Sequence, residues 1–134
     1  MKIKTTEYAE GTEKDVLTGA VIGCAIDVHK GLGVGLLESA YEAALAYELG
    51  LQGIGYERQK PLHIQYKGVK IDCAYRLDFL IEDSLILEIK SVAKHEPIFE
   101  AQLLTYLKLA NIKKGLLINF NTRWLKDGLK RMVL

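Results

Sequence analysis

The stretch RLDFLIEDSLILEIKS, residues 76–91, decides the fold because it is an apolar strand pair with charged side chains at set positions. Alternate side chains of a β-strand point to the same face. Three aliphatic side chains should share one face: Leu85, Leu87 and Ile89. The opposite face carries Ile86 and then, side by side, Glu88 and Lys90. A carboxylate and an ammonium in so apolar a strand need a partner or a ligand, because buried charge is costly.

Asp78 is a further charge in apolar surroundings, on the preceding predicted strand. Residues 75–81 and 84–92 are expected to pair as a hairpin, which brings Asp78 within reach of Glu88. Two converging carboxylates suit Mg²⁺ or Mn²⁺, and a neighbouring lysine such as Lys90 can position water or offset charge on a phosphate. The alternative is a structural ion pair between Glu88 and Lys90, helped by Asp78.

This arrangement resembles the PD-(D/E)XK nuclease superfamily, whose core strand pair carries an Asp and then Glu/Asp-x-Lys. The matching residues are Asp78 and Glu88-Ile89-Lys90, although Arg-Leu stands before Asp78 where the name has a proline. The resemblance implies an α/β domain of the α+β type, with a restriction-endonuclease-like core and a mixed central sheet flanked by helices. It also implies catalytic roles for Asp78, Glu88 and Lys90. Asp78, Glu88 and the carbonyl of Ile89 would bind Mg²⁺ or Mn²⁺.

GLLESAY, residues 35–41, is similar to the signature of the small GxxExxY proteins, a branch of that superfamily, since Gly35, Glu38 and Tyr41 fit it. On a helix, Glu38 shares a face with Tyr41, Glu42 and Leu45, so its carboxylate can point inward at a sheet edge. The resemblance implies that Glu38 joins the metal site. The alternative is an exposed helical glutamate.

Gln102 and Tyr106 are four residues apart and hence on one face of a predicted helix. They match the QxxxY element of the RecB-like nucleases. The resemblance implies that Gln102 faces the active site, where it would orient Lys90 or the water, and that Tyr106 contacts nucleic acid. A core-packing Tyr106 with an incidental Gln102 is the alternative. The resemblance as a whole covers the chain from about Asp15 to LKDGLKR (125–131).

Hydrophobic periodicity predicts the other elements, in the order ααββββαβ(β). We expect helices over about 15–30, 36–49 and 97–110, and strands over 63–67, 69–73, 75–81, 84–92 and 114–119. For the tail, 127–134, a strand is favoured over the alternative of a short helix. The segment GLGVG (31–35) does not follow a strand, so it predicts a helix-to-helix turn rather than a phosphate-binding loop.

Composition predicts one domain over residues 1–134, with a loose lead-in over 1–13. The 134 residues are 49% hydrophobic and 26% charged, as in ordinary soluble globular proteins. No apolar run approaches the roughly 18 residues of a membrane span, and the polar start lacks a secretory signal. We therefore expect a cytoplasmic protein without membrane association. Cys24, Cys73 and the three histidines show no metal-ligand spacing.

The net charge of +1 hides an uneven distribution. Residues 1–60 carry a net −3, residues 61–110 a net −1, and residues 111–134 a net +5. A basic end suits a phosphate backbone, and the alternative is an ordinary solvated surface. The side chains expected to bind nucleic acid there are Lys113, Lys114, Arg123, Lys126, Lys130 and Arg131.

Together these features predict a metal-dependent nuclease that hydrolyses phosphodiester bonds of nucleic acid, with DNA as the expected substrate. The alternative is a non-catalytic nucleic-acid-binding or partner-binding module that keeps the nuclease fold. A third hypothesis, a structural protein with a polar pair in its sheet, predicts that Asp78 and Glu88 contribute to stability and not to metal affinity. The small size is compatible with a homodimer or a place in a larger complex.

Overall fold

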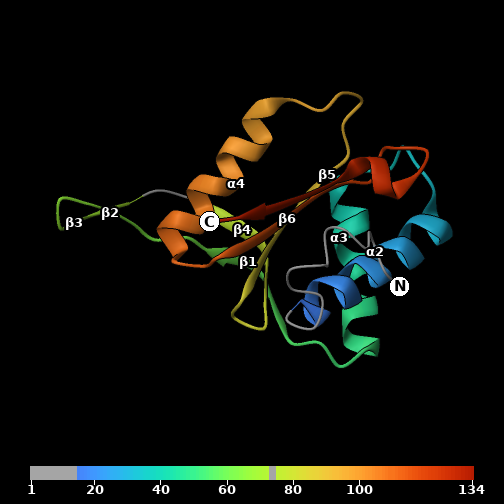
Figure 1. Cartoon of the computed structure of the whole chain (residues 1–134), viewed down its shortest axis with the longest axis horizontal. Coiled ribbons are helices and arrows are strands. Elements are labelled where there is room, and N and C mark those ends of the chain that lie inside the picture. The colour runs from blue at the N-terminus through green and yellow to red at the C-terminus, as the bar shows by residue number, and fades with distance from the viewer. Residues whose placement is uncertain (1–14, 73–74) are drawn as a thin grey trace.

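The protein is a mixed β-sheet with helices on both faces, as seen in a computed structural model that describes residues 15–72 and 75–134 (Figure 1). The helices are α2 (Val16–Leu32), α3 (Glu38–Leu51) and α4 (Pro97–Ala110). The strands are β1 (Tyr56–Pro61), β2 (Ile64–Tyr66), β3 (Val69–Ile71), β4 (Arg76–Ile81), β5 (Leu85–Lys90), β6 (Lys114–Asn119) and β7 (Leu129–Val133). A 3₁₀ turn, η2 (Leu125–Gly128), precedes β7.

Five strands form the main sheet in the order β1-β4-β5-β6-β7. β4 and β5 form an antiparallel hairpin. Its turn residues Glu82 and Asp83 have φ of 51° and 53°, as the tight turn of a twisted hairpin requires. α4 connects β5 to β6, which run parallel, and β1 and β7 are antiparallel edge strands. The predicted fold class, a mixed sheet flanked by helices, is confirmed.

Most predicted elements are confirmed within two or three residues. α4 and β6 have the predicted limits. The predicted helix-to-helix turn at GLGVG is present, although its first two residues are still the end of α2 and the connection to α3 begins at Gly33. The tail is a strand from Leu129, although a 3₁₀ turn occupies its first predicted residues. The hairpin around Lys67-Gly68 is present, but Cys73, at its predicted end, lies outside the described residues.

The predicted order of elements was wrong in one respect, because it contained no strand at the position of β1. Five strands, not four, lie between α3 and α4. β1, with the sequence YERQKP, is an edge strand, and none of its residues is fully buried. Such a strand has no alternation of apolar and polar residues, because neither of its faces is fully covered.

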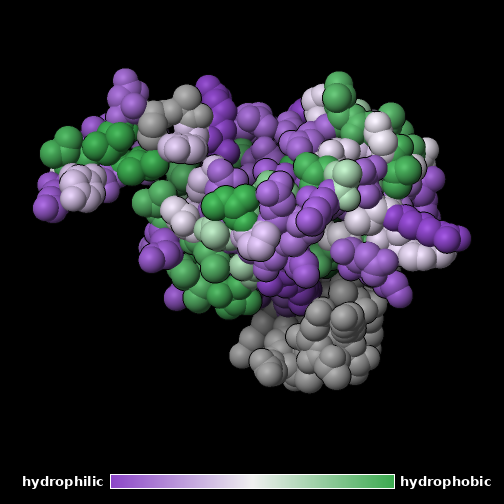
Figure 2. Space-filling view, turned by 90° about the horizontal axis from the view of Figure 1, so that it is seen from above, coloured by the Kyte–Doolittle hydropathy of each residue, from purple (hydrophilic) through white to green (hydrophobic). Residues whose placement is uncertain are grey.

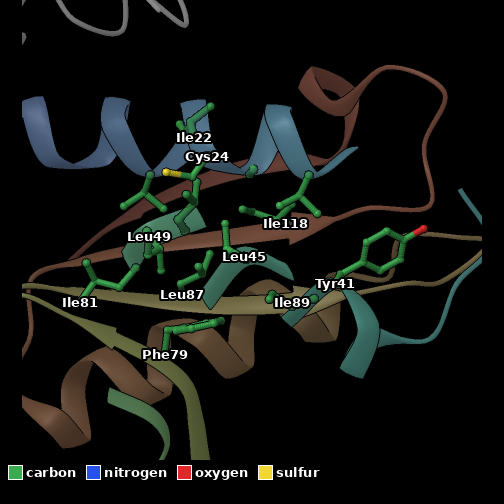
Figure 3. Close-up of a cluster of buried hydrophobic side chains, with 14 of the residues drawn as sticks. Ile22, Cys24, Tyr41, Leu45, Leu49, Phe79, Ile81, Leu87, Ile89 and Ile118 are labelled. Carbon is green, nitrogen blue, oxygen red and sulfur yellow. The ribbon is translucent and has the colours of Figure 1, made fainter. Parts of the chain in front are cut away.

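Two apolar clusters cover the two faces of the sheet. The cluster under α2 and α3 includes Leu85, Leu87 and Ile89 of β5 (Figure 3). The cluster under α4 includes Ile86. The predicted alternation along β5 is therefore confirmed, and it directs Glu88 and Lys90 toward the side of α4.

The helices are short elements with one buried stripe each. In α2 the stripe has the spacing of one helix face, and its members are Thr18, Val21, Ile22, Cys24, Ala25 and Val28. Burial raises the pKa of the Cys24 thiol, as expected for a thiol that serves as core. No helix in the described part of the chain is long and apolar enough to cross a membrane.

Candidate active site

The β4–β5 hairpin opens at Asp78 and Glu88, where side chains replace backbone hydrogen bonds. The strand pairing runs from Ile81↔Leu85 to Phe79↔Leu87 and ends there. Beyond it, the Ile89 N–H donates to Asp78 Oδ2 at 2.8 Å, and the Asp78 N–H donates to Glu88 Oε2 at 2.9 Å. We call this region the fork: Asp78 on β4 and Glu88, Ile89 and Lys90 on β5. Both predicted acids are thus held at one place by the main chain of the opposite strand.

The carboxyl groups of the fork lie in an environment that disfavours negative charge. Glu88 is only 7% exposed. Burial, followed by the negative charge of Asp78, raises the pKa of Glu88 to about 8. Burial also raises the pKa of Asp78, with smaller contributions from Glu42 and Glu38. Without a cation, the fork therefore favours a shared proton over two full negative charges.

Lys90 supplies positive charge to the fork. Its ammonium lowers the pKa of both fork carboxyl groups. The Nζ atom lies 4.7 Å from the centre of the Phe99 ring of α4, a cation–π distance. This contact holds the lysine side chain along the α4 side of the sheet, next to Glu88.

Helix α3 presents two glutamates, one turn apart, at the ends of the strands. Glu38 Oε2 accepts a long hydrogen bond, 3.4 Å, from the Ser91 N–H just past β5. Glu42 is more enclosed: Arg58 donates to its Oε2 at 2.9 Å and 3.2 Å. The negative charge of Glu38 raises the pKa of both fork carboxyl groups, so Glu38 lies close enough to act on the same site.

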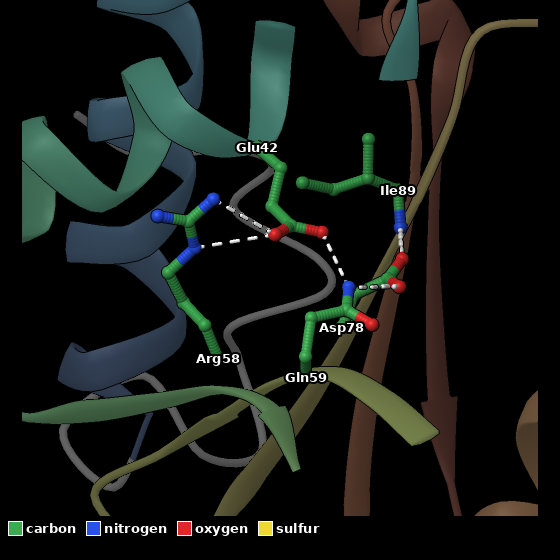
Figure 4. Close-up of polar contacts among 5 residues, drawn as sticks. All are labelled: Glu42, Arg58, Gln59, Asp78 and Ile89. Atoms are coloured by element: carbon green, nitrogen blue, oxygen red, sulfur yellow. Dashed lines mark hydrogen bonds and ion pairs between the residues drawn. The ribbon is translucent and has the colours of Figure 1, made fainter. Parts of the chain in front are cut away.

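Gln59 links α3 to the fork and was not predicted. Its side-chain amide donates to Glu42 Oε1 at 2.7 Å and, more loosely, to Asp78 Oδ1 at 3.4 Å (Figure 4). Its backbone has φ of 50°, a conformation that non-glycine residues rarely adopt. A glutamine in a polar edge strand gives no sequence signal for this role. Glu42 could have been predicted as a further site residue, because it lies four residues after Glu38 on the same helix face.

Tyr41 explains why the glycine-rich turn precedes Glu38. Its ring is fully buried and stacks on Phe120 at 4.5 Å between ring centres. Its hydroxyl donates to the Gly33 carbonyl at 2.7 Å and accepts from the Leu36 N–H at 3.2 Å. Tyr41 therefore fastens the turn that sets the start of α3, where Glu38 lies.

Comparison with known families decides the affiliation. A family model of the PD-(D/E)XK nuclease superfamily matches residues 15–132. The chain belongs to this superfamily. No curated protein and no solved structure matches it. The narrower resemblance to GxxExxY proteins stays a prediction.

Members of this nuclease superfamily usually use divalent metal ions, and the fork suits one. Within residues 15–72 and 75–134, no three Asp, Glu, His or Cys side chains converge closely enough to enclose an ion. Mg²⁺ is commonly bound through one or two carboxylates, with waters and substrate phosphates completing its shell. Asp78 and Glu88 provide two such oxygens, and a cation between them would offset the burial that raises both pKa values and the charge of Asp78 that raises the pKa of Glu88 further.

The second predicted nuclease element, Gln102 with Tyr106, lies on α4. Gln102 is half-buried and forms a hydrogen bond with Tyr106 that lowers the pKa of the tyrosine. Tyr106 is only 7% exposed, belongs to the apolar cluster under α4 and lies 6.3 Å from the Tyr75 ring. Burial raises the pKa of Tyr106, and the charge of Glu88 raises it further, so its phenol lies near the fork. Its main contacts are those of a core residue.

The structure separates the basic residues of the C-terminal segment. Because β5 and β6 are parallel, Lys90 pairs with Asn119, whereas Lys114 pairs with Leu85 at the other end of the sheet. At that far end Lys114 and Arg131 each form an ion pair with Asp15 at 3.3 Å. Lys113 precedes Lys114 there.

Two of the other three basic residues, Arg123 and Lys126, lie past the end of β6 that is level with Lys90, and Lys130 lies in β7 opposite Leu117. Arg123 and Lys126 are exposed in the segment that follows β6. Lys130 and Lys90 line the same cavity, of 190 Å³, with Asn121 and Thr122. Only half of the predicted basic surface therefore lies at the end of the sheet where Glu88 and Lys90 are found.

Proposed function

We propose that this protein is a metal-dependent nuclease that hydrolyses phosphodiester bonds of nucleic acid, with DNA as substrate. The observation that carries the proposal is the fork, where Asp78 and Glu88 are held by opposite main chains beside Lys90. A sheet built only for stability would continue its backbone pairing there. Membership of the nuclease superfamily supports the same conclusion.

In this proposal the fork holds Mg²⁺ or Mn²⁺ through Asp78, Glu88 and the carbonyl of Ile89. Glu38, whose carboxylate contacts the Ser91 N–H and does not converge with the two fork acids in this structure, is proposed to join the set when the ion binds. The bound ion would activate water and stabilise negative charge on the phosphate. The hydrogen bonds from the Ile89 and Asp78 N–H groups fix the carboxylates before any ligand arrives. That orientation reduces the ordering needed when an ion binds.

Lys90 is proposed to stabilise the charge that grows on the scissile phosphate. Its ammonium is held next to Glu88 by the Phe99 ring, so it need not be ordered during the reaction. Gln102 is proposed to orient Lys90 or the attacking water from α4. Arg123, Lys126 and Lys130 would hold the nucleic-acid backbone at the same end of the sheet. Tyr106 is only 7% exposed, so it is proposed as a nucleic-acid contact only through its phenol, which lies near the fork.

The test combines cation binding with cleavage on the same samples. Mg²⁺ and Mn²⁺ binding is measured by calorimetry for the wild type, Asp78→Asn, Glu88→Gln and a matched control, Glu57→Gln. Glu57 is an exposed acid of β1 paired with Lys60. Cleavage of labelled double-stranded DNA, single-stranded DNA and RNA is followed in parallel.

We expect cation binding and cleavage to be lost together in Asp78→Asn and Glu88→Gln and to be kept in Glu57→Gln. Cleavage of RNA alone would correct the substrate. A folded wild type that binds neither ion, with or without added nucleic acid, would overturn the metal site. The non-catalytic module would then be favoured, and the Gln59 amide that joins Glu42 to Asp78 supports that second hypothesis, because it satisfies carboxylate oxygens without an ion.

A further inference from the structure

The β2–β3 hairpin stands apart from the sheet. Its two strands pair only with each other, and Figure 1 shows it extending away from the main body. Figure 2 shows the same arm as a projection with mixed hydrophobic and hydrophilic side chains. An isolated two-stranded hairpin is only marginally stable in water, so this arm is of a kind that a partner would stabilise.

The two faces of the arm differ in character. Residues paired across antiparallel strands share a face, so the pairs Ile64↔Ile71 and Tyr66↔Val69 make one apolar face. Tyr66 is 63% exposed and Val69 61%. The other face carries the pair Gln65↔Lys70. The apolar face is thus open to solvent over most of its length.

The charge of the arm favours an anionic partner. The hairpin itself, residues 64–71, contains Lys67 and Lys70 and no acidic residue, a net +2, and Asp72 follows it. Lys60 of β1, before the hairpin, is paired with Glu57. Lys67 and Lys70 are exposed, and the Lys67 ammonium lies 5.4 Å from the centre of the Tyr66 ring. The tip therefore combines cationic groups with an aromatic side chain, a combination that binds phosphates and bases.

The base of the arm adjoins the fork. β1 ends at Pro61, β4 begins at Arg76, and the Leu62 N–H donates to the Tyr75 carbonyl at 2.9 Å between them. Arg76 is two residues before Asp78. The turn at Lys67-Gly68 is about ten residues from Asp78 along the chain, a span of at most about 35 Å. A nucleic acid that runs from the fork toward Arg76 and Pro61 would reach the arm.

We propose that the β2–β3 hairpin is a nucleic-acid clamp that enters a groove of the substrate duplex. A major groove admits a two-stranded β-ribbon. Lys67 and Lys70 would neutralise phosphates, and Tyr66 would contact bases or sugars with the apolar face. This inference rests on the proposed function, because the fork defines where the nucleic acid lies.

The experiment measures binding without cleavage. Each variant is made in a Lys90→Ala background, and fluorescence anisotropy of a labelled DNA duplex is recorded over a range of salt concentrations. The hairpin variants are Lys67→Ala/Lys70→Ala and Tyr66→Ala. The matched control is Lys30→Ala/Lys108→Ala, which removes two exposed lysines from α2 and α4. Thermal unfolding of every variant checks that the main fold is kept.

We expect Lys67→Ala/Lys70→Ala to make the negative slope of log affinity against log salt less steep by about 2, that is, by about 1 for each lost phosphate contact. Tyr66→Ala should lower affinity by about tenfold. The control should match its parent. Equal affinity and equal slope in the hairpin variants would overturn the clamp and leave the proposed function intact, whereas absence of binding by the parent would overturn both.

Sedimentation velocity distinguishes a protein partner. Val69→Ser/Ile71→Ser removes apolar groups from the open face without changing charge. If the parent is a dimer that this variant converts to a monomer, with unchanged affinity for DNA, the arm is an interface between two copies and the clamp is wrong. A monomeric parent whose DNA affinity falls in this variant supports the clamp.

Discussion

The two halves of the β4–β5 hairpin show what the same pair of strands can do. Near the turn, Phe79, Leu80 and Ile81 pair with Leu87, Ile86 and Leu85 through the backbone, and all six side chains are buried. Beyond Phe79, the carboxylates of Asp78 and Glu88 accept the N–H groups instead. The first half stabilises the fold. The second exchanges backbone pairing for a place where two carboxyl groups with raised pKa values are held beside Lys90.

This difference has a physical cost that a ligand can offset. Burial of carboxyl groups destabilises their charged forms, as the raised pKa values of Asp78 and Glu88 indicate. The hydrogen-bonded apolar half must supply the stability that the fork lacks. Mutations in the two halves should therefore separate stability from function.

The largest expected effect is in the apolar half. Leu87 is fully buried in the centre of the sheet, so Leu87→Ala should lower the free energy of unfolding by about 3–5 kcal/mol through lost burial and a cavity. Urea denaturation measures this change. Cation binding by the fraction that stays folded should be preserved. A loss below about 1 kcal/mol would contradict the distinction between the halves.

Lys90→Met should have the opposite effect from Leu87→Ala, since it should lower the cleavage rate and leave the stability of the fold almost unchanged. Methionine keeps an unbranched apolar chain against Phe99 but removes the charge proposed to stabilise the transition state. We expect the cleavage rate at saturating substrate to fall by about 10²–10³-fold, with little change in the midpoint of urea unfolding. A variant with normal kcat would remove Lys90 from the catalytic role, whatever the stability.

The pH dependence of stability tests the fork without any substrate. The folded-state pKa of Glu88 is about 8, above its ordinary value of 4.5, so the folded state binds more protons between these values. The free energy of unfolding of the metal-free protein should therefore be highest near pH 5 and fall by roughly 2–4 kcal/mol as the pH rises through 8.

Glu88→Gln should flatten that profile, because the amide does not titrate. Saturating Mg²⁺ should restore stability to the wild type near pH 8, since an ion bound only by the folded state stabilises it. Urea unfolding at several pH values, with and without Mg²⁺, gives both results. A wild type whose stability rises from pH 5 to pH 8 would contradict the raised pKa of Glu88 in the folded state.

The sequence predicts the fork better than its surroundings for a physical reason. Charged residues inside apolar strands stand out, so Asp78, Glu88 and Lys90 were found from alternation and resemblance. β1 was missed because an exposed edge strand carries no such contrast. The separation of Lys113 from Lys130 could not be predicted from charge, because it depends on which end of parallel strands each residue reaches.

Gln59 lies in the region that the sequence could not predict, and it provides the smallest and most specific prediction. Its backbone has φ of 50°, which glycine tolerates without strain. Gln59→Gly should therefore keep or slightly raise the free energy of unfolding. It should also lower Mn²⁺ affinity by about tenfold, because the variant loses the amide that orients Asp78.

Gln59→Asn is the matched control for this change, since asparagine also tolerates a positive φ but its shorter amide cannot reach both Glu42 and Asp78. Both variants should share the loss of Mn²⁺ affinity in calorimetry and differ only in stability. If Gln59 only holds β1 in place, the Mn²⁺ affinity of each variant will change in the same direction as its free energy of unfolding. Gln59→Gly, which keeps its stability, will then bind Mn²⁺ as tightly as the wild type. Opposite signs for stability and affinity at one residue would show that the strained backbone exists to present an amide to the fork.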